Sequence, residues 1–406
     1  MRRIWIKIIG WLLITAALGF SQEVRYGNLP QLISQIRSAM PGQNSYAFVV
    51  PTQAQMDSFR AVTNLILTEQ YYLADSLAQM MDYQLYQWYD TASNNELFYV
   101  LMEPNANQSG GVQLGWGTFV FNPDGQQEVI IEVPHPYFDT NTWEVGFAAY
   151  QMLDSRFFLM AGTHRYANGT NPRPADVAHN TQNMFHVVHQ QVSPLCTHSL
   201  QVHGFSRNNH PGYPDIVLSN GTPNPGPILD SLETEFNNAG YTVGIFDGIN
   251  WTALGATTNT QGQWSNSLGY SFIHMELESF IRLSQTEWEN IVDALYNVFY
   301  LPLAIPQEAD AIIPDELVLY PNYPNPFNPS TTIRYYLPRR GEVNVEIFNI
   351  RGERVRVLLK ETQSAGEKNL MWYGRDDRGL LLPSGTYFVR VKTFDQQTSR
   401  KLHLVK

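Results

Sequence analysis

The middle of this chain alternates between short apolar runs and longer segments with a helical pattern. Short apolar runs of β-branched residues, such as 129–133, are typical of strands that are covered on both faces. We predict strands at 128–133, 157–161, 199–204, 215–219, 241–246 and 271–278, and helices at 142–155, 175–190, 227–239 and 284–299. Such alternation predicts an α/β fold, a mostly parallel sheet with helices on both faces.

The segments on either side of this region have different patterns. Residues 53–90 are predicted to be rich in helix, and strand-like runs at 96–103 and 111–122 predict a hairpin. Residues 301–318, with three prolines, predict a linker. Short alternating strands separated by glycine-containing turns predict that 319–406 is a small C-terminal all-β, Ig-like sandwich.

The first 21 residues predict a signal peptide. Arg2, Arg3 and Lys7 form a positive start, and the apolar run 8–20 precedes small residues suited to cleavage near Gln22. A membrane anchor is the alternative, although this run is short for a span of about 20 residues. No later segment is apolar enough to cross a bilayer, so we expect an exported mature protein without a membrane span.

Charge changes sign near the predicted linker. Residues 22–318 contain 8 Arg, no Lys and 29 acidic residues, whereas 319–406 contain 15 basic and 8 acidic residues. The acidic part argues against a nucleic-acid partner, because phosphate binding needs a cationic surface. The single cysteine, Cys196, excludes an internal disulfide and a cysteine-rich zinc site. We therefore predict one domain at 22–300, the linker at 301–318 and a second domain at 319–406.

A set of motifs runs through the second domain. They are YPNPFNPSTTI at 323–333, NIRG at 349–352, Trp372, Gly374, Asp376, Gly379, SGTY at 384–387 and the closing residues 401–406. With these motifs the domain resembles the C-terminal sorting domain of the type IX secretion system. The resemblance implies that the type IX machinery is a partner, and that the protein passes through the periplasm to the cell surface or the medium. It also implies that this domain carries no catalysis.

The first predicted core strand ends in residues suited to binding a metal. Pro134 and Pro136 stop the strand and hold His135 at its end, and Asp139 follows four residues later. Asn141 is predicted to cap a helix, with Glu144 in a capping box. Ligands of open α/β sheets bind at the carboxyl ends of strands. A neutral imidazole and a carboxylate at such a place predict two ligands of Zn²⁺.

Two later strands supply the remaining candidates. His203 lies near the end of 199–204 and is the best third ligand. In 271–278, period-two alternation places His274, Glu276 and Glu278 on one face. Glu276 is predicted to be the general base, and Glu278 is the alternative. Two histidines and one carboxylate with an open fourth position form a common catalytic zinc site.

In this order the residues resemble the zinc carboxypeptidase-like superfamily, nearest its poly-γ-glutamate hydrolase and N-formylglutamate amidohydrolase branches. The matches are His135, Asp139 with Thr142, His203-Gly204 and Glu276-Leu277-Glu278. The acidic ligand of the family is usually a glutamate, so Glu132 is an alternative to Asp139. The resemblance implies a zinc-dependent hydrolase of amide bonds.

Further polar residues are candidates for binding substrate. Arg165 is predicted to clamp a substrate carboxylate, because a guanidinium binds carboxylates with two hydrogen bonds. Ser219, Asn220 and Asn259 lie in predicted substrate loops. His164 could replace His203 as a ligand. His186 and His189 could share a metal of their own, and Asp176 with His179 could reach the site.

The sequence thus predicts an exported, zinc-dependent hydrolase of amide or peptide bonds, acting on a peptide or an acylated amino acid. The alternative is a non-catalytic cell-surface or matrix-binding protein on a degenerate hydrolase fold. A serine hydrolase is disfavoured, because no Gly-x-Ser-x-Gly elbow is present.

Overall fold

The structure is a computed structural model that describes residues 23–93, 95–300, 316–320, 322, 327, 331–339, 341–363, 366–378 and 380–405. The predicted signal peptide and most of the predicted linker lie outside these residues. Apart from residues 92–96, the described residues from 23 to 300 form one compact unit, and the described residues from 316 onward form another.

The larger unit is built on one mixed sheet of ten strands in the order β1-β2-β3-β4-β6-β5-β7-β10-β8-β9. Its centre, β6-β5-β7-β10, is parallel, and antiparallel pairing begins at β4 on one side and at β8 on the other. The strands are β1 Val24–Gly27, β2 Gln84–Asp90, β3 Glu96–Met102, β4 Thr118–Phe121, β5 Gln127–Val133, β6 Ser155–Met160, β7 His198–Phe205, β8 Ile216–Ser219, β9 Val243–Ile245 and β10 Ser271–Glu278.

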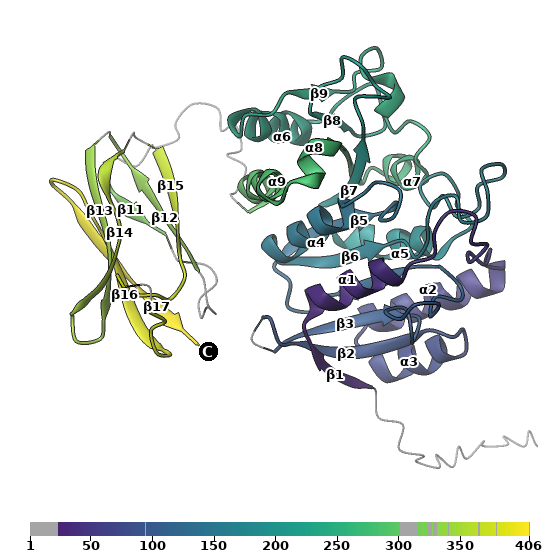
Figure 1. Cartoon of the computed structure of the whole chain (residues 1–406), viewed down its shortest axis with the longest axis horizontal. Helices are drawn as coiled ribbons and strands as arrows, with labels where there is room; N and C mark the ends of the chain where they lie inside the picture. Colours follow the sequence, from purple (N-terminus) through teal and green to yellow (C-terminus); the bar gives the residue numbers. More distant parts are fainter. Residues whose placement is uncertain are drawn as a thin grey trace, which may run out of the picture. The chain divides into compact units, whose positions relative to one another are not determined.

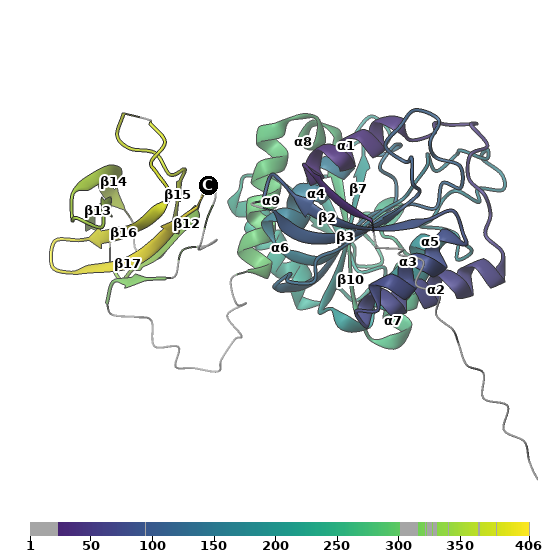
Figure 2. The same cartoon turned by 90° about the horizontal axis from the view of Figure 1, so that it is seen from below.

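Helices cover both faces of this sheet (Figures 1 and 2). One face packs against α1 Leu29–Ala39, α4 Thr142–Met152, α6 Pro227–Asn238, α8 Ser279–Leu283 and α9 Gln285–Phe299. The other face packs against α2 Gln53–Leu67, α3 Tyr71–Gln79, α5 Met184–Val192 and α7 Thr260–Leu268. The predicted α/β class is therefore confirmed.

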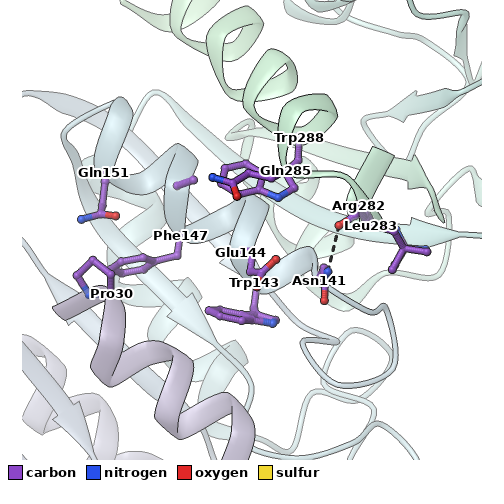
Figure 3. Close-up of a pocket in the computed structure, with 11 residues that line it drawn as sticks. Pro30, Asn141, Trp143, Glu144, Phe147, Gln151, Arg282, Leu283, Gln285 and Trp288 are labelled. Atoms are coloured by element: carbon purple, nitrogen blue, oxygen red, sulfur yellow. Dashed lines mark hydrogen bonds between the residues drawn. The ribbon is translucent and has the colours of Figure 1, made fainter. Parts of the chain in front are cut away.

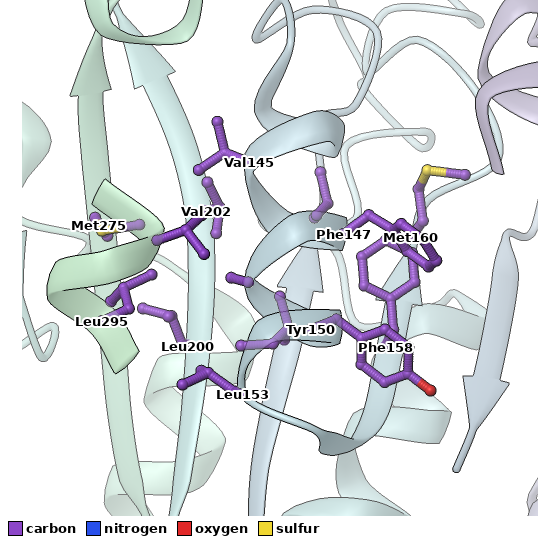
Figure 4. Close-up of a cluster of buried hydrophobic side chains, with 14 of the residues drawn as sticks. Val145, Phe147, Tyr150, Leu153, Phe158, Met160, Leu200, Val202, Met275 and Leu295 are labelled. Atoms are coloured by element: carbon purple, nitrogen blue, oxygen red, sulfur yellow. The ribbon is translucent and has the colours of Figure 1, made fainter. Parts of the chain in front are cut away.

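Strand alternation divides the core into two layers. On β5, Ile131 and Val133 face the layer that contains α4, whereas Ile130 faces the layer that contains α5. Figure 4 shows how Val145 and Tyr150 of α4 pack toward the strands. Burying each side chain of this kind stabilises the fold by about 1.5–3 kcal/mol. These contacts fix α4, and with it the loop that precedes it.

Several predicted elements are shorter than expected, because side-chain oxygens accept hydrogen bonds from backbone N–H groups in these segments. Only Met184–Val192 of the predicted helix 175–190 is helical, since Asn183 accepts a hydrogen bond from the His186 N–H and starts the helix there. The run 111–122 pairs only at Thr118–Phe121, because the Glu103 carboxylate binds the N–H groups of residues 113–115. The region 53–90 ends in the strand β2, which its helix-rich pattern did not predict.

Two helix starts also differ from the prediction. Asn141 is the N-cap residue of α4, but its φ is 64° and its side chain makes no capping hydrogen bond, so the predicted capping box is wrong. Its Nδ2 instead donates to the Arg282 carbonyl. The predicted substrate loop that contains Asn259 becomes helix at Thr260, because Asn259 caps α7 through the Gly262 N–H.

The smaller unit is a sandwich of two antiparallel sheets, β11-β12-β15 and β14-β13-β16-β17, as expected for an Ig-like domain. Its strands are β11 Val318–Leu319, β12 Thr331–Leu337, β13 Gly341–Asn349, β14 Arg354–Gln363, β15 Gly366–Trp372, β16 Gly385–Lys392 and β17 Gln397–Leu404. Phe327, Trp372 and Tyr387 are buried in its core. Across the described parts of both units, no helix combines the length and apolarity needed to cross a membrane.

Candidate metal centre

Three neighbouring parallel strands bring the predicted metal ligands together. The order β5-β7-β10 is continuous and parallel, so the carboxyl ends of these strands meet at one edge of the sheet. His135 and Asp139 follow β5, and His203 lies near the end of β7. All three side chains are buried, with exposures of 1%, 4% and 4%. These residues therefore meet at the edge of the sheet that the sequence predicted, at the carboxyl ends of the parallel strands.

The three candidate ligand atoms have the spacing of a tetrahedral zinc site. Nδ1 of His135 lies 3.4 Å from Asp139 Oδ2, and Nδ1 of His203 lies 3.3 Å from the same oxygen. The rings of the two histidines are 4.9 Å apart and nearly perpendicular. Tetrahedral zinc with bonds of about 2.0–2.2 Å places its ligand atoms roughly 3.4 Å from one another. The three atoms therefore fit one common ion of this size.

The far nitrogen of each imidazole is held by a hydrogen-bond acceptor. Nε2 of His135 lies 2.9 Å from Asp176 Oδ1, and Nε2 of His203 lies 3.2 Å from Gln201 Oε1. These oxygens accept hydrogen bonds, so each Nε2 carries the ring proton. In the neutral rings, both Nδ1 atoms then face Asp139 with a lone pair, which is the state that binds a metal.

Electrostatics shows why a cation belongs among these three residues. Burial raises the pKa of Asp139, but the neighbouring His135 and His203 side chains outweigh that effect and hold it well below its usual range. Burial lowers the pKa of His203 to about 4, despite the hydrogen bond with Asp139. His203 is thus neutral and Asp139 anionic near pH 7, which is the charge state in which both can bind a metal ion.

Arg165, the predicted substrate clamp, is engaged with Asp176. Its Nε and Nη2 both donate to Asp176 Oδ2, and its Nη1 lies 3.5 Å from His135 Nδ1. Asp176 is fully buried. Burial raises the pKa of Asp176, but its hydrogen bonds and the charges of His135 and Arg165 lower that pKa by more. Arg165 therefore holds Asp176, which in turn holds His135.

Arg282 fixes the loop that carries Asp139. Its guanidinium is buried and donates to the carbonyls of Thr140, Leu277 and Phe205. It passes so close to Gly204 that a Cβ there would stand 2.4 Å from its Cζ. The glycine that follows His203 is thus needed for packing, and Arg282 ties the loop to both β7 and β10.

Glu276 lies beside the three ligands with one free oxygen. Its backbone pairs with that of His203, and its side chain is 8% exposed. Oε2 has no hydrogen-bond partner, whereas Oε1 lies 3.6 Å from His274 Nε2. Burial, followed by the negative charge of Asp139, raises the pKa of Glu276 well above its usual value. A basic carboxyl group thus stands next to the candidate metal position.

The alternative base, Glu278, and the alternative ligands, His164 and Glu132, have other contacts. Glu278 caps α8 through the Phe280 N–H, and Nδ1 of His164 accepts from the Tyr166 N–H. Glu132 binds His189 on the side of the sheet that faces α5. Two further groups of ligating atoms occur among the described residues, but each shares a histidine with the first group: His135 with Asp176 and His179, and His203 with His274 and Glu276.

The predicted substrate residues are engaged in local hydrogen bonds. Ser219 Oγ donates to the Gly255 carbonyl and accepts from the Gly221 N–H. Asn220 closes its own loop through Thr222 and Asn224. The amide of Asn259 is used by Gly262 and Gln201. No contact in the described chain supports a substrate role for these three residues, which stays a prediction.

Figure 3 shows a separate pocket of about 370 Å³ between α1, α4 and the α8–α9 region. Trp143, Phe147 and Trp288 supply its apolar walls, and Glu144 and Arg282 are among its other lining residues. Asn141 reaches it from the loop after Asp139, and its side chain bonds to the Arg282 carbonyl. None of the three candidate ligands lines this pocket, so it is distinct from the metal centre.

A family model described as the FlgD Ig-like domain matches residues 329–397, within the smaller unit. No curated protein matches the chain. The match covers less than half of the sequence and concerns the β-sandwich alone.

Solved structures similar to parts of the chain fall into two groups. N-formylglutamate amidohydrolase from Ralstonia eutropha JMP134 is 12% identical and matches over 46% of this chain and 98% of its own, with a TM-score of 0.34. PorU from Porphyromonas gingivalis is 26% identical over 24% of this chain, with a TM-score of 0.20. PorZ, a surface component of the type IX secretion system of the same bacterium, is 23% identical over 22% of this chain, with a TM-score of 0.17. The chain spans only 10% of PorU and 11% of PorZ. All three TM-scores lie below 0.5, so the function proposed below depends on the contacts of the site itself.

Proposed function

We propose that the larger unit is a zinc-dependent hydrolase of amide-type bonds. One observation carries this proposal: Nδ1 of His135 and Nδ1 of His203 lie 3.4 Å and 3.3 Å from the same Asp139 Oδ2, while Nε2 of each ring is bound to another acceptor. Three acceptor atoms this close repel one another unless a cation lies among them. Two imidazoles and one carboxylate are the ligands of a catalytic zinc ion.

A zinc ion held by these residues would polarise the substrate carbonyl and lower the pKa of a water molecule to about 7. Glu276 supplies the base. Its free Oε2 takes a proton from the attacking water and returns that proton to the leaving amine. A nearby cation favours the ionised carboxylate, which opposes the burial that otherwise keeps Glu276 protonated.

The arginines of the site suggest how an anionic substrate would be bound. Arg165 and Arg282 are engaged with Asp176 and with backbone carbonyls. The Arg173 side chain is 44% exposed, and its Nη1 lies 3.6 Å from Asp176 Oδ2. Because it is the more accessible of the two arginines at Asp176, we propose Arg173 in place of Arg165 as the group that meets a substrate carboxylate. The substrate would be a peptide or an acylated amino acid.

Metal content and activity of the full exported chain test this function together. The purified protein should contain about one zinc per chain and should hydrolyse members of a panel of peptides and N-acyl amino acids. Chelation should abolish that activity, and added zinc should restore it. His203→Ala should lose both zinc and activity. His198→Ala is the matched control, because His198 lies on the same strand, where its side chain contacts Ser271 and Phe299 and none of the candidate ligands among the described residues.

The deep burial of the cluster favours one alternative, a non-catalytic binding protein that keeps this fold. That alternative predicts zinc-free protein that is fully folded, with His203→Ala as stable as the parent. Bound zinc without any hydrolysis would leave a structural metal site. Either result would reject the hydrolase.

We further propose that the smaller unit directs export by the type IX secretion system. The motifs between 323 and 406 support this proposal, as does the Ig-like sandwich that contains many of them. In a bacterium with that system, the full chain should reach the surface or the medium, whereas a chain ending at 318 should stay in the periplasm. Equal location of the two chains would contradict the proposal.

A further inference from the structure

We propose that Gln201 sets the tautomer of His203 and so makes it a metal ligand, with Glu132 and Asn259 fixing the orientation of the Gln201 amide. This inference rests on the proposed zinc site. A glutamine amide can present either its oxygen or its NH₂ group to a neighbour. The choice decides which nitrogen of the adjacent imidazole carries the proton.

Glu132 fixes the direction in which the NH₂ group of Gln201 points. It is fully buried, and its Oε1 lies 2.6 Å from His189 Nδ1. Its Oε2 accepts a hydrogen bond of 2.9 Å from Gln201 Nε2. The same Nε2 also donates to Gln261 Oε1 at 3.3 Å. The NH₂ group of Gln201 therefore faces two acceptor oxygens, which a glutamine carbonyl oxygen could not satisfy. Glu132 on β5 and Gln201 on β7 are direct partners across the strands, so the register of the sheet builds this contact.

Asn259 independently fixes the direction in which the carbonyl oxygen of Gln201 points. Its Oδ1 accepts from the Gly262 N–H at 3.0 Å, as the N-cap of α7. Its Nδ2 is therefore left to donate, and it does so to Gln201 Oε1 at 2.8 Å. A backbone N–H on one side and a buried carboxylate on the other thus select the same orientation of Gln201.

The orientation of the Gln201 amide determines which nitrogen of His203 carries the ring proton. Its Oε1 lies 3.2 Å from His203 Nε2 and can only accept, so His203 carries its proton on Nε2. Nδ1 then faces Asp139 Oδ2 at 3.3 Å with a free lone pair. A flipped Gln201 would place its NH₂ group against His203 Nε2. The ring proton would move to Nδ1 and block the position of the metal. Gln201, Glu132 and Asn259 are thus positioning residues, not ligands.

Glu132→Gln tests this inference, because the amide that replaces the carboxylate can donate and so permits Gln201 to flip. In metal-free protein labelled with ¹⁵N-histidine, NMR correlations between ring nitrogens and ring protons distinguish the two tautomers. The parent His203 should be in the Nε2–H form, and the variant should shift toward the Nδ1–H form. Its zinc affinity, measured by competition with a chromophoric chelator, should fall by about 10–100-fold.

A second variant and a matched control separate this effect from general destabilisation. Asn259→Ser keeps a good N-cap but removes the donor to Gln201, so it should change the tautomer and the zinc affinity in the same direction. Glu103→Gln alters another buried carboxylate, which binds three backbone N–H groups far from the site in the sequence. It should lower stability and leave both readouts unchanged.

The outcomes distinguish the two proposals. Parent protein that binds no zinc would reject the proposed function, while the tautomer of His203 in metal-free protein still tests the positioning role. If His203 keeps the Nε2–H form in both Glu132→Gln and Asn259→Ser, with unchanged zinc affinity, then the Gln201 amide does not control this ligand.

Discussion

Gly204→Ala should destabilise the larger unit, although the substitution usually does the opposite. At a compatible position, replacing glycine by alanine stabilises a protein by about 0.4–1 kcal/mol through the entropy of the unfolded chain. Gly204 lies in a strand without a positive φ, so its backbone can accept alanine. The added Cβ, however, would stand 2.4 Å from both Cζ and Nε of Arg282 and 2.8 Å from its Cδ.

The structure gives the magnitude of the effect. Non-bonded heavy atoms need about 3.5 Å, so the guanidinium must move by roughly 1 Å. It donates to Leu277 O and Phe205 O at 3.0 Å each, and also to Thr140 O. Hydrogen bonds from charged groups contribute about 1.5–3 kcal/mol each. Losing two of the three, less the gain from alanine, predicts a decrease of about 2–5.5 kcal/mol in the free energy of unfolding.

A double-mutant cycle measured by urea unfolding tests this reasoning. In an Arg282→Ala background the clash is absent, so Gly204→Ala should then be neutral within about 0.5 kcal/mol or slightly stabilising. Gly385→Ala is the control, because Gly385 is also a strand residue and a Cβ there meets nothing within 4 Å. If Gly204→Ala costs nothing in the parent chain, or the same amount in both backgrounds, the proposed role of Arg282 is wrong.

Three further predictions concern the metal centre. Glu276→Gln should keep zinc but reduce kcat by about 10²–10⁴-fold, as steady-state kinetics with metal analysis would show; full activity would place the base elsewhere. Asp176→Asn should weaken zinc binding by about 10–100-fold in a chelator competition, whereas unchanged affinity would mean that it does not orient His135. Zinc affinity should also fall as the pH falls. Burial and the Arg165 charge lower the pKa of His135, but hydrogen bonds with Asp139 and Asp176 raise that pKa by more. Zinc must therefore displace a proton that is held more tightly than in free imidazole. Below that pKa the affinity should drop about tenfold per pH unit, and a flat profile in titrations from about pH 8 to about pH 5.5 would contradict it.

The sequence predicted those parts of the site that depend on local pattern. The strand 271–278 has the bounds found in β10, and His135, Asp139 and His203 meet where parallel strands end. The role of Arg165 could not be predicted from local pattern. Its partner, Asp176, lies in a loop whose course depends on hydrogen bonds made by Asn180 and Asn183, and the pattern there resembled a helix. Local periodicity cannot show which arginine will pair with which buried carboxylate.

One sequence signal could have located the polar network behind His203. A central strand that is buried on both faces usually has a nearly continuous apolar sequence. β7 and β10 instead alternate. Leu200, Val202, Ile273, Met275 and Leu277 belong to the core layer around α4, whereas Gln201, His203, His274 and Glu276 face the other way and are buried as well. Polar groups on an inner face must be hydrogen-bonded or must bind a ligand, since burying them alone costs about 1–3 kcal/mol each. When neighbouring elements cover both faces of a strand, an alternation of apolar and polar residues along that strand therefore predicts an internal polar site. The particular partners, Glu132 and Asn259, depend on strand register and on the α7 cap, which only the folded chain defines.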